Sequence, residues 1–257
     1  MRASDYAFFD TRFQALAHRG GQHPGIGENS LRAFARALEL GYRYVETDVH
    51  ATADGVLMAF HDTSLERVTD GHGQITDHTA ADLAEVRIGG TDPIPTVAEL
   101  FETFPQARFN IDLKSAGGIA PLARLLEEYQ AYDRVCVASF SSARLAAFRK
   151  LTGDRVATGM APGSVVLLAL SGLGTAGWAL GNAAQVPARV AAGLLPVVTR
   201  RFVEAAHRTG RRVHVWTIND AAEMNRLIDL GVDGIVSDDV VVLKDVLCAR
   251  GLWEGEA

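Results

Sequence analysis

Residues 44–50, YVETDVH, form an apolar run interrupted by two carboxylates. The alternation predicts a β-strand, in which residues two apart point to the same face. Glu46 and Asp48 are therefore expected side by side, where the strand opens into a loop. A second β-like run, residues 55–60, leads into His61 and Asp62. Two carboxylates and an imidazole so close in sequence favour a divalent cation together with a proton-transferring group.

Runs of this kind alternate with helical patterns along the whole chain. Strands are expected at 13–17, 43–48, 108–114, 135–138, 155–159, 184–186, 212–217 and 234–237. Helices are expected at 31–40, 97–104, 119–130, 142–151, 199–209, 220–230 and 239–249. Repeated strand–helix alternation implies a parallel sheet. About eight such units in 257 residues predict an α/β protein with a closed (β/α)8 TIM barrel, formed by one domain spanning residues 1–257.

Two features qualify this prediction. Residues 49–92 contain many short polar turns and little helical period, so we expect a small insertion after the second strand. A doubly wound open sheet is the alternative architecture, but none of the predicted strands leads directly into a G-x-G-x-x-G turn.

Charge and composition limit the class of partner. The net charge of −6 and a pI near 5.7 argue against nucleic acid as the main partner, although a local basic pocket for one phosphate stays possible. The first six residues lack the apolar segment of a secretory signal, so a cytoplasmic enzyme is expected.

Residues 164–181, SVVLLALSGLGTAGWALG, carry no charge over a length close to the minimum for a membrane span. The segment is also rich in glycine and other small residues. We favour a barrel helix followed by a loop. A peripheral surface that touches a membrane, or a true span, remain the alternatives.

Polar residues collect at the carboxyl ends of the predicted strands. His18 and Arg19 follow the first strand, Glu46 and Asp48 end the second, Asp112 and Lys114 end the third, and Trp216 ends the penultimate one. In a (β/α)8 barrel these positions share the catalytic face. Any one of them alone is as well explained by a solvated loop, a helix cap or packing. Their convergence on one rim indicates a site.

The chemistry that such a set permits is narrow. Glu46, Asp48 and Asp112 are hard oxygen ligands, which suit Mg²⁺ or Ca²⁺ better than zinc. Arg19 and Lys114 can hold the non-bridging oxygens of a phosphate. Two histidines can divide the proton work, one accepting a proton and the other donating one. Cleavage of a phosphodiester uses all of these parts, because negative charge grows on the phosphorus oxygens.

Several short motifs occur in a fixed order over nearly the whole chain. They are His18-Arg19-Gly20, Glu28-Asn29-Ser30, Glu46-x-Asp48, Asp54-Gly55, His61-Asp62, Asp112-x-Lys114, Trp216-Thr217-x-Asn219 and Gly231-Val232-Asp233-Gly234-Ile235. This ordered set resembles the glycerophosphodiester phosphodiesterase family, part of the phosphatidylinositol-phosphodiesterase-like TIM-barrel superfamily. The resemblance implies a metal-dependent hydrolase that releases an alcohol and glycerol phosphate from glycerophosphodiesters.

The resemblance also implies a role for each matching residue. His18 and His61 would be the acid/base pair, Glu46, Asp48 and Asp112 the ligands of one Mg²⁺ or Ca²⁺, Arg19 and Lys114 the phosphate contacts, and Trp216 a residue lining the site. The implied partner is a small glycerophosphodiester or a lysophospholipid. Membrane contact through 164–181 would suit the lipid substrate.

The chain departs from the family pattern in two places. Asp112 stands where the family more usually has the longer Glu, and Ser237-Asp238-Asp239 replaces its Thr-Asp-x-Pro. The Asp112-x-Lys114 form resembles spider-venom-type sphingomyelinase D. Cleavage of a lipid phosphodiester, as by a lysophospholipase D or a sphingomyelinase D, therefore remains an alternative. A non-catalytic phosphate-binding barrel is another, but it has no need of two histidines. His50 shares parity with Asp48 and could approach the site, but it is expected to lie in a turn.

Overall fold

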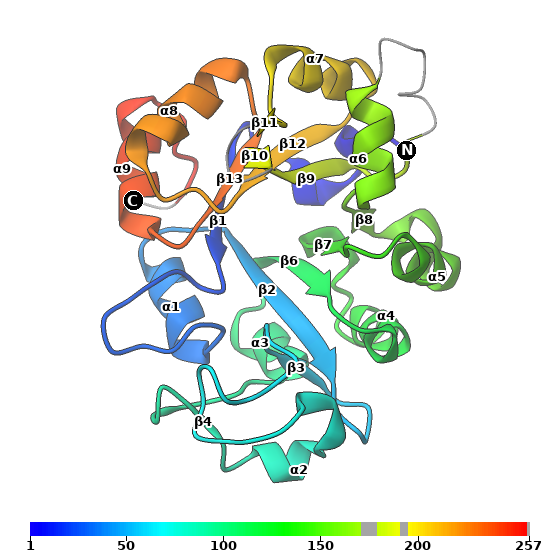
Figure 1. The fold of residues 1–257 in the computed structure, drawn as a ribbon, viewed down its shortest axis with the longest axis vertical. Helices are drawn as coiled ribbons and strands as arrows, with labels where there is room; N and C mark the ends of the chain where they lie inside the picture. The colour runs from blue at the N-terminus through cyan, green and yellow to red at the C-terminus, as the bar shows by residue number, and fades with distance from the viewer. Residues whose placement is uncertain (171–178, 191–194, 256–257) are drawn as a thin grey trace.

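The computed structural model describes residues 1–170, 179–190 and 195–255. In this part of the chain, eight parallel strands form the inner wall of the molecule (Figure 1). They are β1 (Gln14–His18), β2 (Tyr44–Ala51), β6 (Arg108–Leu113), β7 (Val135–Ala138), β8 (Ala157–Thr158), β9 (Ala183–Pro187), β12 (Arg212–Trp216) and β13 (Gly234–Ser237). Their order is β8-β7-β6-β2-β1-β13-β12-β9, and a parallel bridge between Gly159 and Ala183 joins the two edges. The nearly closed barrel confirms the predicted fold class.

Helices connect the strands and cover the outside of the barrel (Figure 1). They are α1 (Leu31–Glu39), α3 (Val97–Thr103), α4 (Ile119–Glu128), α5 (Ser142–Thr152), α6 (Pro162–Ala169), α7 (Arg200–Arg208), α8 (Ala221–Leu230) and α9 (Val240–Ala249). Side chains cap the N-termini of six of these eight helices. Ser30 accepts a hydrogen bond from the Ala33 amide, and Thr96 forms a reciprocal capping box with Glu99.

The insertion after the second strand has its own small core. β2 runs on to Ala51 and pairs with the antiparallel β3 (Leu57–Ala59), after which come α2 (Ala80–Leu83), β4 (Arg87–Ile88) and β5 (Asp92–Pro93). Its apolar cluster includes Met58, Phe60, Leu65, Ile75, Leu83, Ile88 and Ile94. The longer β2 places His50 inside a strand, so the expectation that His50 lies in a turn was wrong.

The uncharged segment 164–181 falls partly outside the described residues. Its first part completes α6, and residues 179–181 lead into β9. In the described ranges, no helix has the length and apolar character needed to cross a bilayer. Residues 171–178 lie outside the description.

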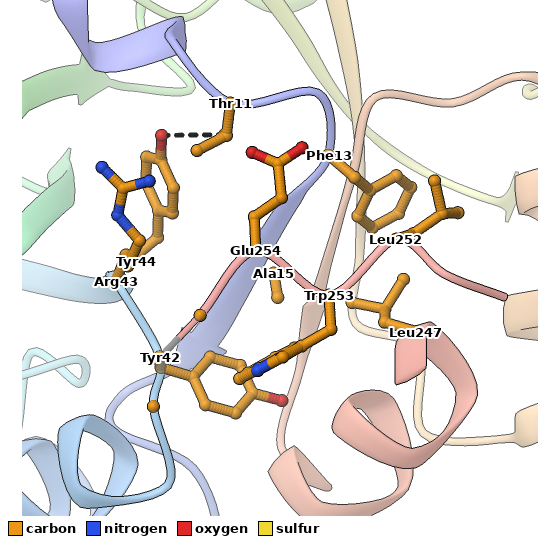
Figure 2. Close-up of a pocket in the computed structure, with 12 residues that line it drawn as sticks. Thr11, Phe13, Ala15, Tyr42, Arg43, Tyr44, Leu247, Leu252, Trp253 and Glu254 are labelled. Carbon is orange, nitrogen blue, oxygen red and sulfur yellow. Dashed lines mark hydrogen bonds between the residues drawn. The ribbon is translucent and has the colours of Figure 1, made fainter. Parts of the chain in front are cut away.

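The C-terminal segment packs beside the start of β1 and the residues that follow α1 (Figure 2). The ring of Trp253 meets Tyr42 edge-on, with 5.0 Å between centroids. The Tyr42 hydroxyl donates to the Val240 carbonyl at 2.6 Å, and Glu254 accepts from the Arg12 amide at 2.9 Å. The remaining cavity of about 10 Å³ has room for at most one water. We interpret this region as packing.

A titratable pair ties α7 to the residues before β13. His207 Nε2 lies 2.8 Å from Asp233 Oδ2, and this hydrogen bond raises the pKa of His207. A pKa raised by folding contributes stability that is complete below the unfolded value and is lost as pH rises through the folded one. We therefore expect His207→Gln to lower Tm clearly at about pH 5 and much less at about pH 9, since the unfolded pKa is near 6.5. Thermal unfolding at both pH values checks this, and equal losses would contradict it.

Candidate active site

Strand register brings the predicted carboxylates to one rim. His18 lies opposite Glu46 between β1 and β2, and Asp48 lies opposite Asp112 between β2 and β6. Glu46 and Asp48 share a face because they are two residues apart on one strand. The three carboxylate residues are all buried, with 3–7 % of their surface exposed. This rim of the barrel therefore gathers negative charge that water does not screen.

Two cations lie among these carboxylates. Arg19 Nε is 3.2 Å from Asp48 Oδ2, and the Arg19 backbone N–H donates to Glu46 Oε2 at 3.2 Å. Lys114 Nζ lies 2.8 Å from both Asp48 Oδ1 and Asp112 Oδ2. Burial alone would lower the pKa of Lys114, but the two carboxylates raise it above its usual value. The ammonium therefore stays charged and offsets part of the negative charge.

The carboxylate oxygens of this rim show whether its residues suit a divalent cation. Asp48 Oδ2 and Asp112 Oδ1 are buried and accept no hydrogen bond from the described residues. Burial, together with the neighbouring Asp48, raises the pKa of Glu46 well above its usual range. A hard divalent cation would relieve both conditions. However, no three His, Cys, Asp or Glu side chains in the described ranges lie close enough to hold a metal as they stand. The carboxylate oxygens are donors of the kind that a hard divalent cation prefers, but Lys114 Nζ contacts two of the predicted ligands, Asp48 and Asp112.

His18 is oriented by a carboxylate. Its Nδ1 lies 2.6 Å from Asp238 Oδ1, so Nδ1–H donates and Nε2 is left facing Glu46 Oε2 at 3.8 Å. Asn219 Nδ2 in turn donates to Asp238 Oδ2 at 2.9 Å. Burial alone would lower the pKa of His18, but the Asp238 hydrogen bond and the Glu46 charge raise it. The imidazole is thus fixed in one orientation at the end of β1.

His61 has the same arrangement on the insertion. Its Nδ1 lies 2.5 Å from Asp62 Oδ1, and Arg67 binds the other oxygen of that carboxylate. Arg67 also contacts Glu28 at 2.7 Å, and Glu28 pairs with Arg19 at 2.9 Å. Arg67 and the His61 hydrogen bond lower the pKa of Asp62 to about 2. This chain of ion pairs connects the insertion to the rim.

An open cavity of about 410 Å³ adjoins these groups, a size that suits a small ligand. It is lined by His50, His61, Asp62, Thr63, Ser64 and Lys114. Trp216 is not among the lining residues. Its ring packs against Phe140, with 5.8 Å between centroids, at the ends of β12 and β7. The structure thus brings His61 and Lys114 to one cavity and leaves Trp216 at another part of the rim.

Comparison with known proteins decides the family. The model of the glycerophosphoryl diester phosphodiesterase family matches residues 18–242. The chain belongs to this family. It is 37% identical, over 94% of its length and 93% of the relative's, to a protein of Mycobacterium tuberculosis named a probable glycerophosphodiester phosphodiesterase 2.

Two further proteins match over most of the length of the chain. A glycerophosphodiester phosphodiesterase of Caldanaerobacter subterraneus is 31% identical over 92% of this chain and 98% of its own. An Oleispira antarctica phosphodiesterase, solved in complex with its product sn-glycerol-3-phosphate, superposes with a TM-score of 0.77. That structure is 25% identical, and the match covers 91% of this chain and 96% of the other.

Several residues that make contacts in this site had no role predicted from the sequence. Asp238 binds His18 across 220 positions, and no local pattern links the two. Arg67 likewise carried no signal. The sequence did contain a signal for His50, because His50 is two residues from Asp48 and points to the same face of the strand. His50 is buried, lines the cavity, and its Nε2–H donates to the His61 carbonyl at 3.0 Å.

Proposed function

We propose that the protein, acting as one domain over residues 1–257, hydrolyses glycerophosphodiesters to an alcohol and glycerol phosphate. One observation carries the proposal. At a single cavity, a histidine held by a carboxylate faces a cation held by two further carboxylates. The first group suits proton transfer and the second suits a phosphate. The names of the relatives and the glycerol phosphate bound to the Oleispira antarctica enzyme support the same substrate class.

His18 and His61 are the proposed acid/base pair. Each donates Nδ1–H to an aspartate, so each keeps Nε2 for proton transfer. One histidine takes a proton from the attacking water, whose oxygen forms a new bond to phosphorus. The other gives a proton to the alcohol oxygen as its bond to phosphorus breaks.

Arg19 and Lys114 are the proposed phosphate contacts. Both are side chains of the rim that already lie among carboxylates, so their charge is held in place before substrate arrives. Fixed cations stabilise the negative charge that grows on the non-bridging oxygens. Trp216 is the proposed contact for the alcohol part of the substrate, although its ring packs against Phe140 outside the cavity lining.

Glu46, Asp48 and Asp112 would hold one divalent cation, Mg²⁺ or Ca²⁺. Two buried aspartate oxygens that accept no hydrogen bond from the described residues, Asp48 Oδ2 and Asp112 Oδ1, and the raised pKa of Glu46 support this assignment. When bound, such a cation supplies Lewis-acid stabilisation of the phosphoryl oxygens. Asp112 reaches less far than a glutamate, and Lys114 competes for two of the ligands.

A substrate panel tests the proposal. Purified protein is incubated separately with glycerophosphocholine, glycerophosphoethanolamine, lysophosphatidylcholine and sphingomyelin, with Mg²⁺ or Ca²⁺ present. We expect glycerol phosphate and the free alcohol from the two glycerophosphodiesters. Turnover of the lipids alone, with a cyclic phosphate as product, would favour the lipid alternative. Binding without turnover of any substrate would favour the phosphate-binding barrel.

The two aspartates that hold the histidines are positioning residues. We expect Asp62→Asn and Asp238→Asn each to lower kcat by at least ~10-fold with little change in KM, because the imidazole loses its fixed tautomer and orientation. Asp77→Asn, an exposed carboxylate of the same insertion, is the control and should leave both parameters unchanged. A rise in KM with unchanged kcat would argue against a positioning role.

A further inference from the structure

The barrel sector that contains α5, α6 and α7 has a charge opposite to that of the whole chain. Residues 134–219 contain eleven Arg and Lys but two Asp and Glu, whereas the net charge of the chain is −6. The rest of the sequence is correspondingly acidic. Such a separation orients a molecule in front of a charged surface.

The same sector exposes apolar side chains. Seven large apolar side chains are exposed among the described residues, and five of them lie between residues 140 and 180. They are Phe140, Leu151, Val166, Leu170 and Leu180. Ser164 Oγ accepts a hydrogen bond from the Leu180 amide at 3.1 Å, which seats Leu180 beside α6. Single exposed apolar residues are ordinary on a protein surface, whereas apolar side chains grouped on one face mark interaction sites.

Exposed cations flank this apolar helix on both sides. α5, α6 and α7 follow neighbouring strands, and Figure 1 shows α6 on the outer wall between the other two. Lys150 on α5, and Arg201 and Arg208 on α7, are exposed and form no ion pair with described residues. Elsewhere, exposed arginines such as Arg36 and Arg250 pair with a carboxylate. The face thus keeps its positive charge available.

We propose that the face formed by α5, α6 and α7 docks onto an anionic lipid bilayer. Apolar side chains of α6 enter the headgroup boundary, while Lys150, Arg201 and Arg208 contact lipid phosphates. Charge complementarity and the absence of charged residues from α6 favour a lipid surface as the occupant. The face reaches the catalytic rim at Phe140, whose ring meets Trp216. The inference goes beyond the proposed hydrolysis, because binding requires no catalysis.

Vesicle sedimentation measures this binding directly. The full chain is mixed with vesicles of phosphatidylcholine alone or with vesicles that also contain phosphatidylglycerol. We expect at least ~10-fold stronger partition onto the anionic vesicles, falling as salt is added, since each surface cation contributes about 1 kcal/mol. Equal partition onto both vesicles, or no binding to either, would overturn the proposal. Retention on polyglutamate without vesicle binding would also overturn it and indicate an acidic protein partner.

Matched variants assign the binding to this face. Val166→Asp on α6 is compared with Val241→Asp on α9, because the two valines are 55% and 53% exposed. Lys150→Glu/Arg208→Glu is compared with Arg36→Glu/Arg250→Glu, which changes the net charge equally. The face variants should each weaken binding at least ~10-fold and the distant ones should not. Equal losses in both sets would contradict the assignment.

Two further readouts separate this inference from the proposed function. Thermal unfolding shows that each variant is folded, and hydrolysis of glycerophosphocholine in solution should be unchanged in all four. Vesicle binding by a protein that hydrolyses nothing would leave the docking surface standing and remove the proposed function. Hydrolysis without vesicle binding would support the proposed function and rule out the docking surface.

Discussion

We expect His61→Ala and His18→Ala each to lower kcat for glycerophosphocholine by at least ~10²-fold, the low end for loss of a general acid or base. The two rings are held alike, by Asp62 and Asp238, so each presents one nitrogen for proton transfer. Steady-state kinetics on the purified variants measures the effect. Because the two histidines act in one reaction, the double variant should cost far less than the product of the single losses.

His72→Ala is the control for this experiment, since His72 is an exposed histidine of the same insertion. It should keep wild-type kinetics. If both active-site variants also kept wild-type rates, the two-histidine scheme would be wrong. A large loss of kcat in one variant alone would assign the proton transfer to that residue.

Removal of divalent cations should abolish turnover, and added Mg²⁺ or Ca²⁺ should restore it. The reason is the group of buried carboxylates, two of whose oxygens accept no hydrogen bond from the described residues. Without a cation, Lys114 and Arg19 alone offset their charge. The measurement is the rate in EDTA, followed by titration with each cation. Unchanged turnover in the chelator would show that the reaction does not need a divalent cation.

Thermal unfolding gives a readout of the cation that does not depend on activity. A cation that binds the folded state alone raises Tm with its concentration. We expect this rise in the wild type and its loss in Asp112→Asn, which keeps the size of the side chain but not its charge. Asp77→Asn is again the control. An equal rise in Asp112→Asn would show that Asp112 is not a ligand.

Much of the barrel could be predicted because its signals are local. The alternation in residues 44–50 predicts a strand whatever surrounds it, and caps such as Ser30 and Thr96 mark helix starts within four residues. The strand ends then follow from the fold, since parallel strands place their carboxyl ends together. This reasoning placed Glu46, Asp48 and Asp112 on one rim, where the register has them.

What the sequence could not supply depends on contacts between distant residues. β2 extends to Ala51 because β3 pairs with it, and that pairing buries His50 beside the cavity. The Asp238 contact to His18 and the Arg67 contact to Glu28 form only when the barrel closes. The position of Lys114 between two carboxylates is likewise a consequence of register.

The proposed reaction is hydrolysis of a glycerophosphodiester by attack of water at phosphorus. Turnover of glycerophosphocholine in water enriched in oxygen-18, followed by phosphorus NMR and mass spectrometry, tests it most directly. We expect one labelled oxygen in the glycerol phosphate and none in the choline. Label in choline, or no release of glycerol phosphate with Mg²⁺ or Ca²⁺ present, would contradict it.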